Sequence, residues 1–234
     1  MNIALILSGG TGTRVGGNIP KQYIEVGCKP IILYALETIA KCADIDRIRI
    51  VADESWQKSI EKFMADSSEE LLLRSKFIGF SAPGETRQLS IYNGLKDIAE
   101  YVADDDYVLI HDAARPCVSG KMLSDCLSAA REHDGAIPVL PMKDTVYLSE
   151  NGTTISQLID RSRIFAGQAP EAFVLGKYIA ANEALMPDKI MSINGSTEPA
   201  VMAGMDIAMI PGDESNYKIT TPADLERFKS EKGL

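Results

Sequence analysis

The stretch IALILSGGTGTRVGGNIPKQY, residues 3–23, decides how this chain folds. Its first five residues are apolar without polar alternation, which is typical of a parallel strand buried on both faces. A glycine-rich turn follows Ser8 and carries the cations Arg14 and Lys21. Glycine lets the backbone approach a ligand and point several N–H groups at it, so the pattern predicts a polyphosphate site. The alternative is a tight strand-to-helix turn with incidental cations.

Two better-known glycine loops do not fit this turn. A Walker loop ends in Gly-Lys-Ser/Thr, but the Gly-Lys pairs of this chain are followed by Met122 and Tyr178. A dinucleotide fingerprint needs a third glycine where Val15 stands. What remains is G-G-x-G-x-R followed by P-K-Q, a phosphate-binding loop that carries its own Arg and Lys.

The composition indicates one soluble, cytoplasmic domain over residues 1–234. A hydrophobic content of 45% is ordinary for a globular core. The net charge of −9 argues against nucleic acid or an anionic membrane as a partner, because either needs a basic surface. The four cysteines show no C-x-x-C spacing, and two histidines are too few for a zinc cluster. No apolar run approaches the roughly 20 residues of a membrane span, and no charged segment precedes the first strand.

Hydrophobic periodicity predicts strands that alternate with helices. Beyond the first strand, we expect strands at 47–51, 107–110, 135–140 and 206–210. We expect helices at 30–42, 56–64, 87–101, 120–133 and 175–185, and one beginning at Thr221-Pro222. Residues 71–78 could finish a helix, with a short strand at 76–80, and Ser55 is the expected cap of the second helix. The alternation predicts an α/β fold with a doubly wound, mostly parallel sheet.

The motif HDAARP, residues 111–116, follows the strand at 107–110. Ligands of open α/β sheets bind beyond the carboxyl ends of the strands, so Asp112 is placed to meet whatever the first loop holds. A carboxylate there can ligate a Mg²⁺ ion that bridges nucleotide phosphates. The alternative is a helix cap or an ion pair with Arg115. We expect His111 to be structural.

Two further segments carry cations beside a helix start. Residues 84–90, GETRQLS, lead into a helix, and exposed N–H groups with an Arg and a Ser suit an anion or a polar base edge. Lys218 precedes the last helix, on what we expect to be a short strand. Taken alone, Lys218 is a surface lysine.

Residues 142–160 change the pattern, because two alternating segments flank Asn151-Gly152. An Asn-Gly pair between alternating strands predicts a β-hairpin. The edges of a hairpin inserted in an α/β fold need a cover, and a second subunit is one way to provide it.

Three motifs in order, the glycine loop with PKQY, HDAARP and NYKITTPADL (216–225), resemble the cytidylyltransferases that act on 2-C-methyl-D-erythritol 4-phosphate or ribitol 5-phosphate. The resemblance covers essentially the whole chain. It implies a Rossmann-like nucleotidyltransferase fold of the GT-A kind, with the hairpin as a dimerisation arm. The implied reaction transfers CMP from CTP to a polyol phosphate, with Mg²⁺ as cofactor and release of pyrophosphate.

The resemblance also implies roles for particular residues. Arg14, Lys21 and Lys218 neutralise the triphosphate and the reacting α-phosphorus, while Asp112 holds Mg²⁺. The residues that line the nucleotide site are Leu7, Ser8, Gly9, Gly10, Gly12, Gly84, Arg87, Ser90 and Ala113. Thr145 and Arg161, on or just after the arm, are expected to reach the partner's active site and hold the acceptor phosphate.

Two segments depart from the family's pattern. QAPE, residues 168–171, stands where the family usually has Q-T-P-Q, and NGSTEP, residues 194–199, falls where it has Thr-Asp-Asp or a near variant. The complete PKQY and HDAARP favour methylerythritol phosphate, an acceptor of isoprenoid biosynthesis. The two departures favour ribitol 5-phosphate or another polyol phosphate, giving CDP-ribitol for a cell-surface polymer. A nucleotide-binding protein without turnover is the third reading, and the intact cations speak against it.

Overall fold

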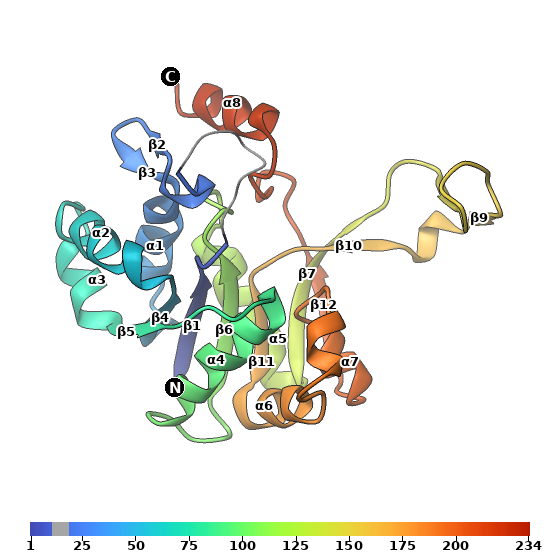
Figure 1. Cartoon of the computed structure of the whole chain (residues 1–234), viewed down its shortest axis with the longest axis horizontal. Helices are drawn as coiled ribbons and strands as arrows, with labels where there is room; N and C mark the ends of the chain where they lie inside the picture. Colours follow the sequence, from blue (N-terminus) through green and yellow to red (C-terminus); the bar gives the residue numbers. More distant parts are fainter. Residues whose placement is uncertain (11–18) are drawn as a thin grey trace.

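A computed structural model describes residues 1–10 and 19–234 of the chain (Figure 1). The predictions for Gly12 and Arg14 lie outside these described residues. Among the described residues, no helix is both long and apolar enough to cross a membrane.

An eight-stranded sheet forms the centre of the molecule, in the order β10-β7-β11-β6-β1-β4-β5, with β12 paired to β7. Its strands are β1 (Asn2–Leu7), β4 (Arg47–Val51), β5 (Phe77–Ser81), β6 (Tyr107–Asp112), β7 (Gly135–Pro141), β10 (Phe165–Gly167), β11 (Glu171–Val174) and β12 (Ile207–Pro211). Strands β5, β4, β1 and β6 run parallel, as do β7 and β12. The antiparallel β11 joins the two parallel groups by pairing with β6 and β7. The predicted mostly parallel α/β sheet is therefore confirmed.

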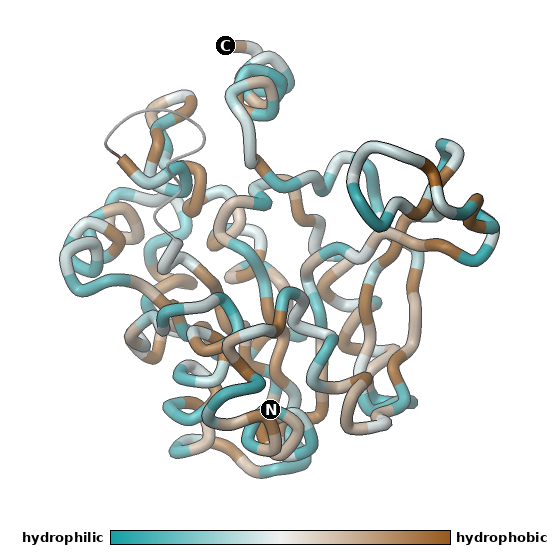
Figure 2. The backbone as a smooth tube through the Cα atoms, turned by 45° about the vertical axis from the view of Figure 1, so that its right-hand side comes forward, coloured by the Kyte–Doolittle hydropathy of each residue, from teal (hydrophilic) through white to brown (hydrophobic). Residues whose placement is uncertain are grey.

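Helices cover both faces of this sheet, which explains the uninterrupted apolar run at the start of the chain. The helices are α1 (Ile31–Lys41), α2 (Glu54–Ala65), α3 (Glu70–Lys76), α4 (Arg87–Ala99), α5 (Gly120–Glu132), α6 (Leu175–Glu183), α7 (Glu198–Met202) and α8 (Pro222–Glu231). Ala4 and Ile6 of β1 pack in the same core as α1 and α5, whereas Ile3 and Leu5 pack with α4 and α6. Hydrophobic segments accordingly lie along the central strands (Figure 2).

Two local predictions were wrong, and a third was confirmed. Asp53, not Ser55, caps α2, because its side chain accepts the N–H of Ser55 at 3.0 Å. The expectation for residues 71–80 is confirmed, because helix α3 ends at Lys76 and strand β5 begins at Phe77. Lys218 lies in a loop and not on a strand, since its segment pairs with no strand of residues 1–10 and 19–234.

The inserted hairpin is present as a separate two-stranded sheet of β8 (Val146–Leu148) and β9 (Gln157–Ile159). It extends away from the main body (Figure 1). The loop between its strands is longer than a two-residue turn, and the Asn151 side chain organises it by accepting the N–H groups of Thr153 and Thr154. This arm contributes no side chain to the hydrophobic cores of the body in the described part of the chain.

Candidate active site

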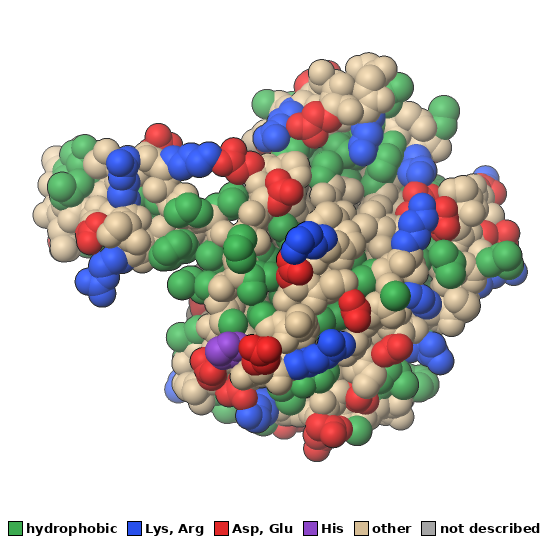
Figure 3. All heavy atoms as spheres, turned by 180° about the vertical axis from the view of Figure 1, so that it is seen from behind, with side chains coloured by type: hydrophobic (Ala, Val, Ile, Leu, Met, Phe, Trp, Pro, Cys, Tyr) green, Lys and Arg blue, Asp and Glu red, His purple; other side chains and the backbone are tan. Residues whose placement is uncertain are grey.

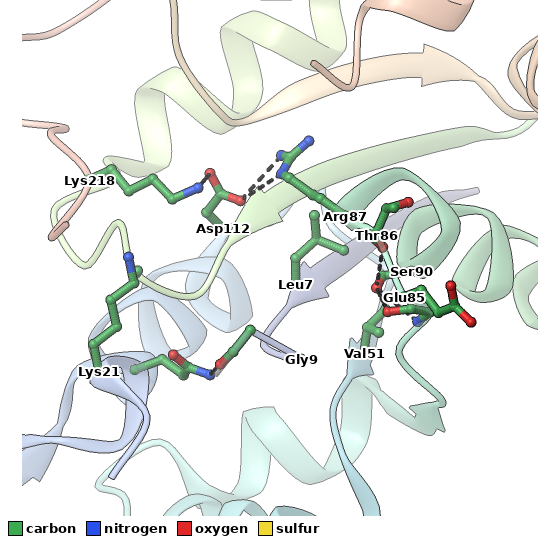
Figure 4. A pocket seen from close by; sticks show the side chains of 14 residues that line it. Leu7, Gly9, Lys21, Val51, Glu85, Thr86, Arg87, Ser90, Asp112 and Lys218 are labelled. Atoms are coloured by element: carbon green, nitrogen blue, oxygen red, sulfur yellow. Dashed lines mark hydrogen bonds and ion pairs between the residues drawn. The ribbon is translucent and has the colours of Figure 1, made fainter. Parts of the chain in front are cut away.

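A pocket of about 480 Å³ opens beyond the carboxyl ends of β1, β4 and β6 (Figure 4). Its lining comprises Leu7, Gly9, Gly10, Lys21, Gln22, Val51, Gly84, Glu85, Thr86, Arg87, Ser90, Asp112, Ala114 and Lys218. These residues come from separated segments of the sequence. The sheet topology therefore gathers Gly9 and Gly10 at the start of the predicted first loop, the 84–90 turn, HDAARP and Lys218 around one space.

The PKQY segment holds the start of the glycine loop in place. Lys21, Gln22 and Tyr23 form a single 3-10 turn, η2. The Gln22 amide donates to the carbonyls of Ser8 and Gly10 at 2.7 Å each, and Tyr23 shares a 2.8 Å hydrogen bond with the Ser8 hydroxyl. Gln22 and Tyr23 thus fix Ser8 and Gly10 at the start of the loop, while Lys21 extends into the pocket (Figure 4).

A cluster of charges surrounds the buried carboxylate of Asp112 at the end of β6. Lys218 Nζ is 2.9 Å from Asp112 Oδ2, Arg87 Nη2 is 3.2 Å from Oδ1, and Arg115 Nε is 3.6 Å from Oδ2. Burial opposes ionisation of Asp112, but the charges of Arg87 and Lys218 hold its pKa well below the usual range. Asp112 is therefore an anion at neutral pH, and the ion pair with Arg115 is one of three.

The loop that carries Lys218 is fastened to the HDAARP segment. Arg115 Nη1 donates to the carbonyl of Asn216 at 2.7 Å, and the N–H of Ile219 donates to the carbonyl of Ala114 at 2.9 Å. His111 is fully buried with Nε2 at 3.1 Å from the Arg115 carbonyl, and burial lowers the pKa of His111 to about 4. A neutral imidazole inside the protein agrees with the structural role expected for it.

The 84–90 turn is shaped by its first and last residues. The N–H of Gly84 donates to the Ser90 hydroxyl at 2.9 Å, while Thr86 caps α4 by accepting the N–H of Leu89. A Cβ on Gly84 would lie 2.8 Å from the Leu89 carbonyl carbon, so only glycine fits without a shift of the backbone. Arg87, the first residue of α4, is thereby aimed at Asp112.

The pocket brings together most of the residues predicted from the sequence. Leu7, Gly9, Gly10, Lys21, Gly84, Arg87, Ser90, Asp112 and Lys218 line it. Ser8 and Ala113 are buried beside it and do not appear in its lining. Sequence reasoning missed Gln22, Val51, Glu85, Thr86 and Ala114. Gln22 could have been predicted from the sequence, because the backbone carbonyls of a glycine-rich loop need hydrogen-bond donors and the amide of PKQY can supply them.

Thr145 and Arg161 do not reach this pocket in the same chain. Both are exposed on the arm, where Arg161 Nη1 donates to the carbonyl of Lys143 at 2.5 Å. The predicted action of these residues in a partner's site remains a prediction.

The described residues of the pocket can bind a metal ion only together with a ligand that supplies further oxygen atoms. Among residues 1–10 and 19–234, no group of three or more His, Cys, Asp or Glu side chains could hold a metal ion. Asp112 offers one ionised carboxylate in the pocket wall. Mg²⁺ is commonly bound by one or two carboxylates together with substrate phosphates and water, so Asp112 fits a nucleotide-bound magnesium ion and not a protein-only cage.

Known proteins resemble the chain over nearly its whole length. Residues 2–230 match the family described as 2-C-methyl-D-erythritol 4-phosphate cytidylyltransferase, IspD. A ribitol-5-phosphate cytidylyltransferase of Vibrio parahaemolyticus is 32% identical, with 98% of this chain and 95% of that protein covered. A 2-C-methyl-D-erythritol 4-phosphate cytidylyltransferase of Geobacillus kaustophilus is 34% identical, with 95% and 92% covered.

Solved structures share the fold. The 4-diphosphocytidyl-2C-methyl-D-erythritol synthase of Anaerococcus prevotii superposes with a TM-score of 0.82 at 23% identity, covering 100% of this chain and 96% of that one. The corresponding cytidylyltransferase of Francisella tularensis gives a TM-score of 0.80 at 24% identity, covering 100% and 99%.

Proposed function

Because the chain belongs to the 2-C-methyl-D-erythritol 4-phosphate cytidylyltransferase family and is a CTP-dependent nucleotidyltransferase, we propose that its acceptor is 2-C-methyl-D-erythritol 4-phosphate. The observation that carries this proposal is the match of residues 2–230 to that family, with PKQY and HDAARP complete. The pocket lies where both motifs meet.

The proposed reaction joins two anions, and the cations of the pocket can reduce the repulsion between them. An acceptor phosphate oxygen attacks the α-phosphorus of CTP, a new P–O bond forms, and the bond to pyrophosphate breaks. That oxygen is already anionic at neutral pH, so no strong base is needed. The barrier arises from bringing the anions together and from charge that develops on the α-phosphoryl and leaving oxygens. Catalysis is therefore positioning plus electrostatic stabilisation.

Each segment of the pocket has a part in this proposal. Backbone amides at Gly9 and Gly10 approach the triphosphate, with Lys21 as the nearby charge. Lys218, held against Asp112 on the opposite wall, contacts the α-phosphate as the pentacoordinate state forms. Arg87 and Ser90 serve the nucleotide from the 84–90 turn. Arg14 is proposed to contribute a further charge from the glycine loop, outside the described residues.

Magnesium is proposed as the cofactor, held by Asp112 together with phosphate oxygens of CTP. When bound, the ion neutralises phosphate charge and fixes the triphosphate conformation. Asp112 meanwhile keeps Lys218 and Arg87 oriented through the ion pairs at 2.9 and 3.2 Å.

Ribitol 5-phosphate is the second candidate acceptor. The specific observation in its favour is the full-length similarity to proteins named ribitol-5-phosphate cytidylyltransferase, at 32% identity for the Vibrio protein and 31% for one from Streptococcus agalactiae. The altered segments 168–171 and 194–199 point the same way, because they depart from the pattern expected for the methylerythritol enzyme.

We also propose that the arm forms a homodimer. Tyr147, Leu148, Ile155, Leu158 and Phe165 are all large, apolar and exposed on or next to the arm. Figure 3 shows such side chains on the arm and on the neighbouring surface of the body. Apolar surface of this kind marks an interaction site. A second copy would cover it and carry Thr145 and Arg161 to the other pocket.

One experiment tests the reaction and the acceptor together. Pyrophosphate release is measured for the four nucleoside triphosphates against methylerythritol, ribitol, glycerol and hexose phosphates, with Mg²⁺ and with EDTA. The proposal expects turnover with CTP and methylerythritol phosphate that EDTA abolishes. Preference for ribitol phosphate selects the second candidate, and preference for a hexose phosphate overturns both.

A further inference from the structure

The two segments that depart from the family pattern touch each other through a buried carboxylate. Glu171, the last residue of QAPE, is only 6% exposed. Its Oε1 accepts a hydrogen bond from the Ser196 hydroxyl, and its Oε2 accepts one from the Thr197 hydroxyl at 2.6 Å. A carboxylate at one departure is therefore satisfied by the hydroxyls of the other.

Buried hydrogen bonds also connect Ser196 to the start of α4. Tyr178 of α6 donates to the carbonyl of Ser196 at 2.6 Å, and the Gln88 amide donates to the Tyr178 hydroxyl at 3.1 Å. Gln88 is the immediate neighbour of Arg87. A displacement of Ser196 can therefore be transmitted through Tyr178 to Gln88, which is next to Arg87 in the pocket wall.

Charge gives Glu171 a second link to the pocket. Three cations, Arg87, Arg115 and Lys218, share the single carboxylate of Asp112. Burial disfavours the charge of Arg87, but Asp112 and Glu171 together hold the pKa of its guanidinium above the usual value. Burial raises the pKa of Glu171 itself, while the charge of Arg87 and the hydroxyls of Ser196 and Thr197 favour its ionised form. Glu171 begins β11, which pairs with β6 at Ile110, two residues before Asp112. Glu171 and Asp112 therefore lie on neighbouring strands, and each favours the charged form of the partly buried Arg87.

We infer that Glu171 is a positioning residue: Ser196 and Thr197 hold its carboxylate, and the carboxylate keeps Arg87 in place for the nucleotide. The mechanism proposed above assigns Glu171 no step, and Glu171 does not line the pocket. The inference rests on the proposed contact between Arg87 and CTP.

The test is CTP binding measured by titration calorimetry with Mg²⁺ and no acceptor. Glu171→Gln keeps the size of the side chain and removes its charge. We expect its affinity for CTP to fall about tenfold, the scale of coupling between contacting buried groups. Glu37→Gln is the matched control, because Glu37 is also a buried carboxylate with a serine donor, Ser67, and a cation, Lys29, but lies away from the pocket. Its affinity should equal that of wild type.

A reciprocal exchange separates positioning from loss of packing. In the double variant Glu171→Gln/Ser196→Asp, the introduced carboxylate returns the charge to the same contact from the opposite side, and the amide introduced at position 171 supplies an N–H donor to it. We expect CTP affinity to recover to within about twofold of wild type. Ser196→Asp alone places two carboxylates against each other and should be the weakest binder of the set.

Each result decides between the alternatives. If the wild-type protein does not bind CTP, the proposed function is wrong. If the wild-type protein binds CTP and Glu171→Gln binds it equally well or more tightly, only the role of Glu171 is wrong. Loss in the single variant without recovery in the double variant also overturns it. If Glu171→Gln does not fold, as judged by thermal unfolding, Thr197→Val leaves the carboxylate present but loosely held. CTP binding about threefold weaker then supports the role, and unchanged binding contradicts it.

Discussion

Asp112 and Arg161 are both expected to act on phosphate chemistry, yet the molecule holds them in opposite ways. Asp112 ends a central strand, is 7% exposed and has three cationic partners within the chain. Arg161 stands exposed on the arm, and its hydrogen bond goes to the arm's own backbone at Lys143. The pocket is organised by the fold of one chain, whereas the arm presents its residues outward.

The difference shows which functional residues a single fold can fix. In the pocket, burial makes each missing partner costly, so the charged groups are tied to one geometry. On the arm, exposed side chains gain little from fixed positions in one copy. Their geometry must come from whatever the arm contacts. Variants of the two regions should therefore differ in stability, in activity and in dependence on assembly.

The largest effect is expected from Asp112→Asn, which leaves three cations without their carboxylate. Removing one partner of a buried ion pair typically costs about 3–5 kcal/mol of unfolding free energy. Because the pKa of Asp112 is depressed in the folded protein, its contribution is present above the unfolded value of about 3.9 and is lost as pH falls toward the folded value. The wild-type and variant stabilities should thus differ by a constant amount between about pH 5 and 8, and the difference should begin to shrink as the pH falls below about 4.

This prediction is checked by urea unfolding of both proteins in EDTA, without nucleotide, from about pH 8 to below about pH 4. The matched arm variant is Asp160→Asn. The Asp160 carboxylate accepts a hydrogen bond from the Ser162 hydroxyl on the exposed 3-10 turn η3 (Arg161–Arg163). Its unfolding midpoint at pH 7 should equal that of wild type. Equal losses in the two variants would mean that the pocket is not the more tightly fixed region.

Lys218→Ala and Lys21→Ala should each lower kcat/KM about 10²- to 10³-fold. Loss of one preorganised charge contact to the reacting phosphate removes about 2.7–4 kcal/mol of transition-state stabilisation. Steady-state pyrophosphate release with CTP and the preferred acceptor measures this loss. Lys121→Ala is the control, because Lys121 is an exposed lysine paired with Asp125 on α5. A loss smaller than about a factor of three removes either lysine from its assigned role.

Arg161→Ala should weaken use of the acceptor by about 1.5–3 kcal/mol in kcat/KM, the usual value of a hydrogen bond to a charged group. CTP affinity should not change. Mixing this variant with Lys218→Ala tests where Arg161 acts. If Arg161 serves the partner's pocket, each heterodimer contains one complete site, and an equal mixture should regain about a quarter of wild-type activity. A mixture no more active than the mean of its components would place Arg161 in its own chain's site.

The smallest effect is expected when one methyl group is removed from a side chain in each of the two regions. Ile6→Val removes it from a fully buried side chain of β1 and should cost about 0.5–1.5 kcal/mol of unfolding free energy. Ile155→Val removes it from an arm side chain that is 64% exposed and should change stability by less than about 0.5 kcal/mol. Thermal unfolding at low protein concentration measures both. A larger cost at Ile155 would show that the arm is buried in an assembly even when dilute.

Sequence reasoning predicted the parts of the molecule that depend on local pattern. The apolar run of β1 and the Thr221-Pro222 helix start were confirmed, and the latter forms a complete capping box with Asp224. HDAARP and the 84–90 turn converge as the α/β topology requires. These features follow from periodicity and from the rule that ligands gather at the carboxyl ends of parallel strands.

The features that sequence reasoning missed depend on contacts between distant residues. Strand β11 has only four residues, and its antiparallel place between β6 and β7 is set by pairing partners far along the chain. The hydrogen bonds of Glu171 join positions about 25 residues apart, and no local signal marks them. The cap of α2 was wrong for a milder reason, since Asp53 and Ser55 are both good capping residues two positions apart.

The aromatic pair beside Ser8 gives this enzyme an optical reporter. Trp56, the only tryptophan, stacks on Tyr23 with ring centroids 4.3 Å apart, and Tyr23 is hydrogen-bonded to Ser8 at the base of the glycine loop. Excitation chosen for indole absorption will therefore sample one location only. Any ligand that displaces Ser8 or Tyr23 should alter the emission of that indole, so affinity can be read directly from the fluorescence of unlabelled protein.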